Sequence, residues 1–199
     1  MTSPTYELTV LGPDDLSQMR QLNALFGRAF DEIDTYSGEP PDDGYLTKFL
    51  GRPHVVVIVA VEASAVLGGL VAYELEKFER RRSEFYIYDL AVDAAHRRRS
   101  VARACIERLR TIARERGGSV IFVQADPPDA PAIALYQKFG VAEKVLHFDC
   151  RCNARPRHAG TIGALVLRSA SSTRGSKCMC AWRSSGGVSA SHWLSDRSA

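Results

Sequence analysis

The sequence feature that most constrains the fold is a strand-like segment that leads through an arginine-rich loop into an amphipathic helix. Residues 84–92, EFYIYDLAV, are rich in the aromatic and β-branched side chains that favour strands. The loop 93–100 carries three consecutive arginines, and from Val101 onward apolar residues recur at helical spacing on one face. A helix N-terminus presents unpaired N–H groups and the positive end of the helix dipole, and basic side chains just before it complete an anion site. The pattern favours pyrophosphate binding over arginines that only face solvent.

The rest of residues 6–149 alternates between strand-like and helix-like patterns. The predicted strands are 6–11, 55–62, 66–78, 84–92, 119–125 and 144–149. The predicted helices are 16–30, 45–50, 101–114 and 132–139. Residues 119–125 form a continuous apolar run, which suits a buried strand. This order predicts an α/β layer structure with a mixed sheet.

Charge is distributed unevenly along the 199 residues. Residues 1–150 hold 18 basic and 22 acidic side chains and so carry a net charge of −4, whereas residues 151–199 carry +7. A nucleic-acid-binding surface needs a broad basic face, so we expect no nucleic acid partner for this acidic body. No basic segment followed by an apolar one is visible at the N-terminus, and no apolar run approaches the ~18 residues of a membrane span. We therefore expect no membrane partner and a cytoplasmic protein with reduced thiols.

Residues 150–199 differ in composition from the chain before them. Residues 151–199 contain ten serines with scattered arginines and glycines, and no apolar residues recur at helix or strand spacing. Such a segment buries too little apolar surface to offset the conformational entropy that folding removes. We predict one folded domain over 1–149 and a low-complexity, basic, disordered tail over 150–199.

Four of the five cysteines lie in two Cys-x-Cys pairs, Cys150/Cys152 and Cys178/Cys180. Structural zinc sites usually have more than one residue between paired cysteines, so we predict no metal site. Cys105 lies on the apolar face of the helix that begins at Val101, and we expect it in the core.

These motifs resemble a known family. The chain is similar to the Gcn5-related N-acetyltransferase (GNAT) superfamily in the segments YDLAV, HRRRSVARA and AIALYQKFG. The acetyl-CoA motif of that superfamily, Arg/Gln-x-x-Gly-x-Gly/Ala, aligns with residues 97–102. A closer resemblance is to the class I aminoglycoside 3-N-acetyltransferases, or gentamicin acetyltransferases. The segments that carry it are FGRAF, the acidic loop with TYS, RSEFYIYDLAV and PAIALYQKFG. The resemblance covers residues 7–149 and does not extend into the tail.

The resemblance implies a fold, a reaction and partners. The implied fold is the GNAT acyl-CoA N-acyltransferase fold, a mixed and mostly antiparallel central sheet with splayed strands, flanked by helices. The implied co-substrate is acetyl-CoA, and the implied substrate is an aminocyclitol aminoglycoside, acetylated on its 3-amino group in a ternary complex. Such activity confers antibiotic resistance, and the family likeness also suggests a homodimer.

The resemblance also assigns the residues that hold acetyl-CoA. Backbone groups of the splayed strand would pair with the pantetheine arm, and these belong to Leu90, Ala91 and Val92. The pyrophosphate would lie on the motif residues Arg97, Arg98, Arg99, Ser100, Val101 and Ala102. Ser100 stands where the motif has glycine. Serine keeps the backbone N–H and is a good helix N-cap, but it lacks the freedom of glycine at positive φ.

Three residues are candidates for catalysis. Acetyl transfer from a thioester to an amine needs one group to take the amine proton and another to protonate the leaving thiolate. Tyr136 matches the family's general acid; the alternative is a half-buried packing tyrosine. Asp89 interrupts an apolar strand, where a carboxylate is costly unless it is paired or useful. We interpret it as the general base, directly or through water, with an edge-strand aspartate satisfied by backbone as the alternative. Glu84 is a weaker candidate for the same relay.

A polyamine substrate calls for several carboxylates. Asp31 and Asp34, with Glu32 between them, lie in the first acidic loop. Besides Asp89, we expect Asp31, Asp34, Asp126 and Asp149 to bind the substrate, although an acidic loop is often only solvated. Two other functions stay open: acetylation of polyamines, peptides or another small amine, and CoA binding or tail-mediated interaction without catalysis.

Overall fold

The computed structural model describes residues 5–146 and 148. Its strands are β1 (Glu7–Val10), β2 (Val55–Glu62), β3 (Ala65–Glu76), β4 (Ser83–Val92) and β5 (Gly118–Val123). Its helices are α1 (Leu16–Phe30), α2 (Asp43–Leu50), α3 (Val101–Glu115) and α4 (Ala130–Tyr136), with a short π-helix η1 (Asp34–Gly38) and a 3₁₀ turn η2 (Ala94–His96). The chain divides into two units after Phe139, and these elements all belong to the first unit.

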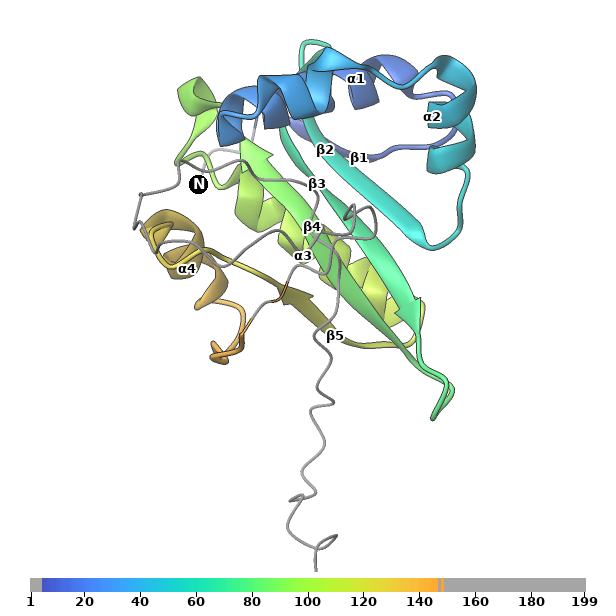
Figure 1. The fold of residues 1–199 in the computed structure, drawn as a ribbon, viewed down its shortest axis with the longest axis vertical. Helices are drawn as coiled ribbons and strands as arrows, with labels where there is room; N and C mark the ends of the chain where they lie inside the picture. Colours follow the sequence, from blue (N-terminus) through green and yellow to red (C-terminus); the bar gives the residue numbers. More distant parts are fainter. Residues whose placement is uncertain (1–4, 147, 149–199) are drawn as a thin grey trace, which may run out of the picture. The chain divides into compact units, whose positions relative to one another are not determined.

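The described strands form one mixed sheet in the order β1-β2-β3-β4-β5. All neighbouring pairs are antiparallel except β4 and β5, which run parallel. Helices α1 and α2 lie on one face of the sheet and α3 lies on the other (Figure 1). This is the α/β fold of helices around a mostly antiparallel sheet that the sequence predicts.

Each face of the sheet carries its own apolar core. The face toward α3 is covered by the apolar side of that helix, including Cys105, whose burial raises the pKa of its thiol to about 12. The face toward α1 and α2 is built from Leu22, Leu25 and Phe26 against alternate residues of β2. Because β2 has helices on both faces, its apolar run is buried continuously over residues 55–60.

β4 and β5 separate before β4 ends. The paired residues stop at Ile87 on β4 and Val123 on β5, whereas β4 continues to Val92. β3 holds this extension, and its pairing runs to Gly68 opposite Val92. A Cβ at Gly68 would lie 2.7 Å from the backbone oxygen of Ala91, so glycine is what lets the two strands approach. The family resemblance implied splayed strands, and this separation confirms them.

β4 also contains a bulge just before the splayed segment. Val71 of β3 pairs with Asp89, but the next residue, Ala72, pairs with Ile87. Tyr88 is therefore an extra residue in β4. A bulge of this kind interrupts the regular alternation of side chains along a strand.

The bulge decides which face carries Asp89. In a regular strand, Ile87 and Asp89 would point to the same face, which here is the face under α3. The bulge instead moves Asp89 to the α1 face, where it meets Tyr36 and where its neighbour Ala91 is also buried. A carboxylate that would have been placed in the apolar core under α3 is thus half-buried on the α1 face, where the Tyr36 hydroxyl is its partner.

Two expectations about strands need correction. Residues 119–125 were expected as a buried strand, yet no residue of β5 is fully buried and Val120 is 38% exposed. Among the described residues β5 pairs only with β4, so its apolar run serves an edge strand. The expected strand over 144–149 is absent from its described part, residues 144–146 and 148. The predicted tail, 150–199, lies outside the described residues, and no described helix is long and apolar enough to cross a membrane.

Candidate active site

Asp89 lies at the centre of the site. Its carboxylate accepts a hydrogen bond of 2.9 Å at Oδ2 from the hydroxyl of Tyr36, a residue of η1. Burial, and next the Asp89 carboxylate, raise the pKa of the Tyr36 phenol well above its ordinary value. Tyr36 is therefore a hydrogen-bond donor at every physiological pH, and Asp89 has a partner that favours its ionised form.

Three more tyrosines surround Asp89 on the same part of the sheet. Tyr73 of β3 meets Tyr88 of β4 edge-on at 5.8 Å between ring centroids, and Tyr88 meets Tyr86 edge-on at 5.9 Å. Burial raises the pKa of all three phenols, and the Asp89 carboxylate adds to the rise in each. Asp89 is thus flanked by neutral aromatic side chains, of which Tyr88 is 43% exposed.

Tyr136 comes from the segment that follows β5. It is the last residue of α4 and packs, half-buried, against the core under α3. Burial raises the pKa of its phenol to about 12, and the carboxylates of Asp129 and Asp89 act in the same direction. The charge of Asp89 thus acts on the Tyr136 phenol, and the roles of the two residues as base and acid stay predictions.

The arginine-rich loop has an unusual backbone. Arg98 and Ser100 both adopt left-handed conformations with φ of 64°. Successive backbone N–H groups in such alternating conformations form concave anion sites, and the first turn of α3 adds unpaired N–H groups. Ser100 is the N-cap of α3, but its side chain makes no capping hydrogen bond. The expected benefit of serine as a cap is therefore absent, and the expected strain at positive φ is present.

The arginine side chains of the loop are not equivalent. Arg99 pairs with both carboxylate oxygens of Glu62, at 2.7 and 3.2 Å, and its guanidinium also contacts Thr5 and lies 2.8 Å from His96 Nδ1. The pKa of Glu62 falls to about 2 because of its hydrogen bonds to Arg99 and Thr5. Arg99 thus fastens the loop to the end of β2, and phosphate binding by its side chain stays a prediction. Arg97 contacts the backbone of Val92 at 3.5 Å.

The geometry fits acetyl-CoA in two respects. Beyond Ile87, β4 extends past its pairing with β5, which exposes an edge of backbone groups for an extended chain such as pantetheine. The loop that follows has the backbone conformation of an anion site at the N-terminus of a long helix. Leu90, Ala91 and Val92 would hold the arm, and residues 97–102 the pyrophosphate.

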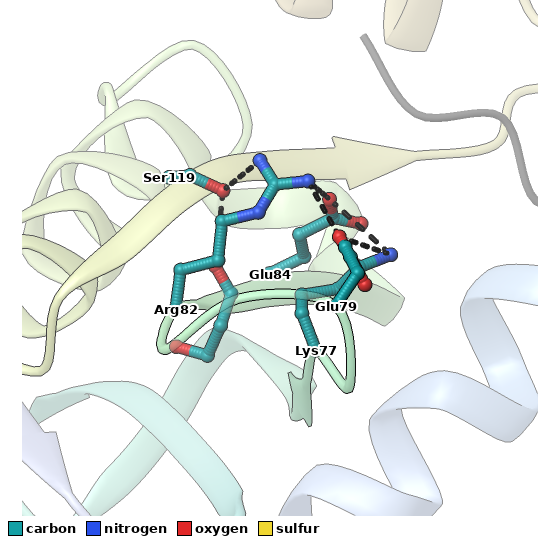
Figure 2. Close-up of polar contacts among 6 residues, drawn as sticks. Lys77, Glu79, Arg82, Glu84 and Ser119 are labelled. Carbon is teal, nitrogen blue, oxygen red and sulfur yellow. Dashed lines mark hydrogen bonds and ion pairs between the residues drawn. The ribbon is translucent and has the colours of Figure 1, made fainter. Parts of the chain in front are cut away.

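Glu84 lies in a different environment. It is 5% exposed, and its carboxylate pairs with Lys77 and Arg82, each at 3.6 Å (Figure 2). Glu79 also contacts both cations. Asp89 lies five positions after Glu84, or roughly 17 Å along a strand. The structure does not bring Glu84 to Asp89, and a catalytic relay through it stays a prediction.

The acidic residues proposed for the substrate are scattered. Asp31 caps the C-terminus of α1 and Asp34 begins η1, and both are exposed. Glu32, between them, is half-buried, and its carboxylate helps to raise the pKa of Tyr88 after burial and Asp89. Of the three acidic residues of this loop, Glu32 is thus the one whose charge acts on the tyrosines beside Asp89. Asp126 is exposed after β5, and Asp149 lies outside the described residues.

Tyr36 is the site residue that the sequence did not reveal. The segment TYS contributed to the family resemblance, but nothing local connects residue 36 to residue 89.

Tyr36 also borders a hollow of about 250 Å³. The residues that line this hollow are Arg20, Asn23, Tyr36, Ser37, Pro40 and Pro41. Within the described part of the chain, no cluster of three or more metal-ligating side chains occurs.

Known proteins resemble this chain in sequence and structure. A profile of the family described as Acetyltransferase (GNAT) family matches residues 19–141. A solved aminoglycoside acetyltransferase from an uncultured soil metagenomic sample is 47% identical, with a TM-score of 0.73 over 77% of this chain and 100% of that one. A second such enzyme, solved in complex with sisomicin, is 30% identical, with a TM-score of 0.70 over 75% of this chain and 97% of that one.

A curated human protein is also similar over a shorter stretch. N-acetyltransferase 8 of Homo sapiens is 28% identical over 92 residues, which is 46% of this chain and 40% of that protein. The aligned part thus spans less than half the length of that relative. The family profile covers more than half of this chain, and a structural relative at 47% identity is covered completely. The chain therefore belongs to the acetyltransferase (GNAT) family.

Proposed function

We propose that this protein transfers the acetyl group of acetyl-CoA to the 3-amino group of a gentamicin-like aminoglycoside, directly within a ternary complex. The observation that carries the proposal is the placement of Asp89. The bulge at Tyr88 moves this carboxylate out of the apolar core under α3 to the α1 face, just after the point where β4 and β5 stop pairing. Such activity would confer resistance to the antibiotic.

The strand and the loop would orient the co-substrate. Bound acetyl-CoA supplies an acetyl group activated as a thioester. The backbone of Leu90, Ala91 and Val92 would align the pantetheine arm along the end of β4. The loop from Arg97 to Ala102 would hold the pyrophosphate through backbone N–H groups and the side chains of Arg97 and Arg98. This fixes the thioester beside Asp89.

Asp89 and Tyr136 would then move the two protons. The substrate amine must lose a proton to become a nucleophile, and Asp89 accepts it directly or through water. The new C–N bond forms as the C–S bond breaks, and Tyr136 donates its phenol proton to the departing thiolate. A pKa of about 12 keeps Tyr136 protonated at neutral pH, as an acid must be.

The surroundings of Asp89 suit a cationic sugar. Carboxylates of Asp89 and Glu32 provide negative charge, and the tyrosine rings provide flat surfaces on which the apolar faces of sugar rings can pack. A relative of this chain was solved with sisomicin bound, which supports an aminoglycoside as the substrate class. We expect the enzyme to act in the cytoplasm and as a homodimer, and sedimentation of the purified chain tests the second expectation.

A thiol-release assay tests the proposed function. The full chain is incubated with acetyl-CoA and, separately, with gentamicin, sisomicin, fortimicin, spermidine and a peptide amine. We expect turnover with the aminoglycosides and its loss in Asp89→Asn. Turnover with spermidine or the peptide alone would establish a different acetyltransferase, and acetyl-CoA binding without turnover of any amine would establish a non-catalytic protein.

A further inference from the structure

A long-range polar contact at the site comes from Tyr36, a residue with no assigned role. Tyr36 and Asp89 are 53 positions apart, yet the Tyr36 hydroxyl donates to Asp89 Oδ2 at 2.9 Å. The contact is the point at which the segment after α1 meets β4. A hydrogen bond to a charged carboxylate is stronger than one between neutral groups and fixes the direction of the carboxylate.

The Tyr36 ring packs against two aromatic side chains of α1. Phe26 and Phe30 of α1 each lie 5.9 Å from it between ring centroids. Gly27 lies between them, and a Cβ there would come within 3.3 Å of Tyr36 Cβ, so the absence of a side chain lets η1 lie against α1. The ring thus packs against both phenylalanine rings of α1 while its hydroxyl donates to Asp89.

The backbone around Tyr36 is also unusual. Tyr36 lies in the middle of η1, a five-residue π-helix, and its N–H donates to the oxygen of Glu32 at 3.3 Å. π-Helices are rare and are often found at functional sites. From this turn the Tyr36 side chain reaches Asp89 of β4.

We propose that Tyr36 is a positioning residue for the catalytic base: its hydroxyl orients the Asp89 carboxylate and keeps it ionised to accept the amine proton. The inference rests on the proposed function, because it requires Asp89 to act as the base. Tyr36 does not exchange a proton itself, because burial and the facing carboxylate raise the pKa of its phenol far above the pH of the cell.

Removal of the hydroxyl has a predictable sign. A carboxylate that loses a hydrogen-bond donor ionises less readily, so a base that depends on it works only at higher pH. Other groups near Asp89 stay in place and set the background for this shift. Besides burial, the Asp89 carboxylate raises the pKa of the phenols of Tyr73 on β3, Tyr86 and Tyr88 on β4, and Tyr136 on α4, and Glu32 before η1 acts with it on Tyr36 and Tyr88.

The test compares pH profiles of kcat/KM for Tyr36→Phe and the unchanged full-length chain, with the best amine of the panel above. Tyr36→Phe keeps the ring between Phe26 and Phe30. We expect kcat to fall about tenfold and the acid limb to move to higher pH by roughly one unit, with little change in the Kd of acetyl-CoA. The substrate is the same in both profiles, so the shift belongs to the enzyme.

Two further variants exclude a structural explanation. Tyr45→Phe is the matched control, because Tyr45 lies on α2, is 56% exposed and stacks on Phe49; its profile should not move. Replacement of Tyr36 by 3-fluorotyrosine, which is a stronger donor, should move the acid limb the other way, to lower pH. A general loss of folding cannot produce shifts in opposite directions.

Asp89→Asn completes a double-mutant cycle. If Tyr36 acts through Asp89, the double variant should be no slower than Asp89→Asn alone. An inactive Asp89→Asn together with an unshifted Tyr36→Phe profile would overturn the role of Tyr36 and leave the proposed function standing. Full activity of Asp89→Asn, or no turnover of any amine by the unchanged chain, would overturn the proposed function and this inference with it.

Discussion

Ser100 occupies a backbone conformation that glycine adopts at no steric cost. Its φ is 64°, and its side chain makes no capping hydrogen bond that would compensate. The left-handed region costs a non-glycine residue about 1 kcal/mol or more. Ser100 thus lies, strained, in the loop that we propose binds the pyrophosphate of acetyl-CoA through its backbone N–H groups.

Ser100→Gly should therefore stabilise the protein by about 1 kcal/mol in the free energy of unfolding. It should also lower the KM for acetyl-CoA modestly, because no Cβ stands near the phosphate. Denaturant unfolding and initial rates measure the two effects. Ser17→Gly, on the exposed side of α1, is the control with the opposite sign, since glycine within a helix destabilises. A higher KM in Ser100→Gly would instead make the serine hydroxyl a ligand.

Tyr136 is expected to act in its protonated form. Its pKa is raised to about 12 by burial, so the acid would be lost only as pH rises through that value. Tyr136→Phe should lower kcat about 100-fold with a smaller change in KM. The unchanged enzyme should show no basic limb from this group below pH ~11. Normal kcat in Tyr136→Phe would leave it as a packing tyrosine, the alternative that its sequence context allows.

At the scale of elements, the two departures from regular geometry are what assemble the site. The bulge in β4 turns Asp89 to the α1 face, and the π-helix η1 brings Tyr36 to meet it. Neither has a local sequence signature: Tyr88 is an ordinary strand residue, and Asp34–Gly38 has the composition of a solvated loop. Both depend on pairing or packing between segments far apart in the chain. The spacing of apolar residues within one segment does not reveal such contacts.

The start of β4 is stabilised by a different set of charges. Lys77, Arg82 and Glu84 form a network at the β3–β4 hairpin, in which the side chains of Lys77 and Glu84 are 7% and 6% exposed (Figure 2). Breaking a buried ion pair leaves an uncompensated charge, which costs several kcal/mol. The contacts of Glu84 therefore account for its burial without a catalytic role.

Glu84→Gln should accordingly lower the free energy of unfolding by about 3 kcal/mol while kcat stays nearly unchanged. Glu79→Gln is the control in the same network: Glu79 is 30% exposed, so its replacement should cost less than ~1 kcal/mol. Thermal or denaturant unfolding, together with kcat of the folded fraction, measures both. A large fall in kcat with unchanged stability would show that Glu84 belongs to the catalytic relay after all.

At the scale of the whole molecule, the sequence predicts the order of elements well up to Phe139. The predicted segment 55–62 matches β2, and the helix predicted to start at Val101 starts there. Such segments have strong periodicity, and periodicity follows from which face is buried. Asp89 and Tyr136 were identified through the family motif, whereas the Tyr36–Asp89 contact needed the fold. The degree of burial of β5 was overestimated because an apolar run does not reveal how many neighbours a strand has.

Residues 151–199 should be dispensable for folding and for activity. Within the part of the chain that the structure describes, the two apolar cores are built from residues up to Phe139. A chain that ends at Cys150 should therefore fold and should keep its kcat/KM for acetyl transfer. Circular dichroism and the thiol-release assay compare it with the full chain. An unfolded or inactive truncation would show that the segment contributes to the domain, contrary to its composition.

The position of the acetyl group on the product tests the central claim most directly. The full chain is incubated with gentamicin and acetyl-CoA, and the product is analysed by mass spectrometry and two-dimensional NMR. We predict a single acetyl group on the 3-amino nitrogen with the unchanged chain, and no product from Asp89→Asn at the same concentration. Acetylation at another nitrogen, no acetylation at all, or equal product from Asp89→Asn would contradict it.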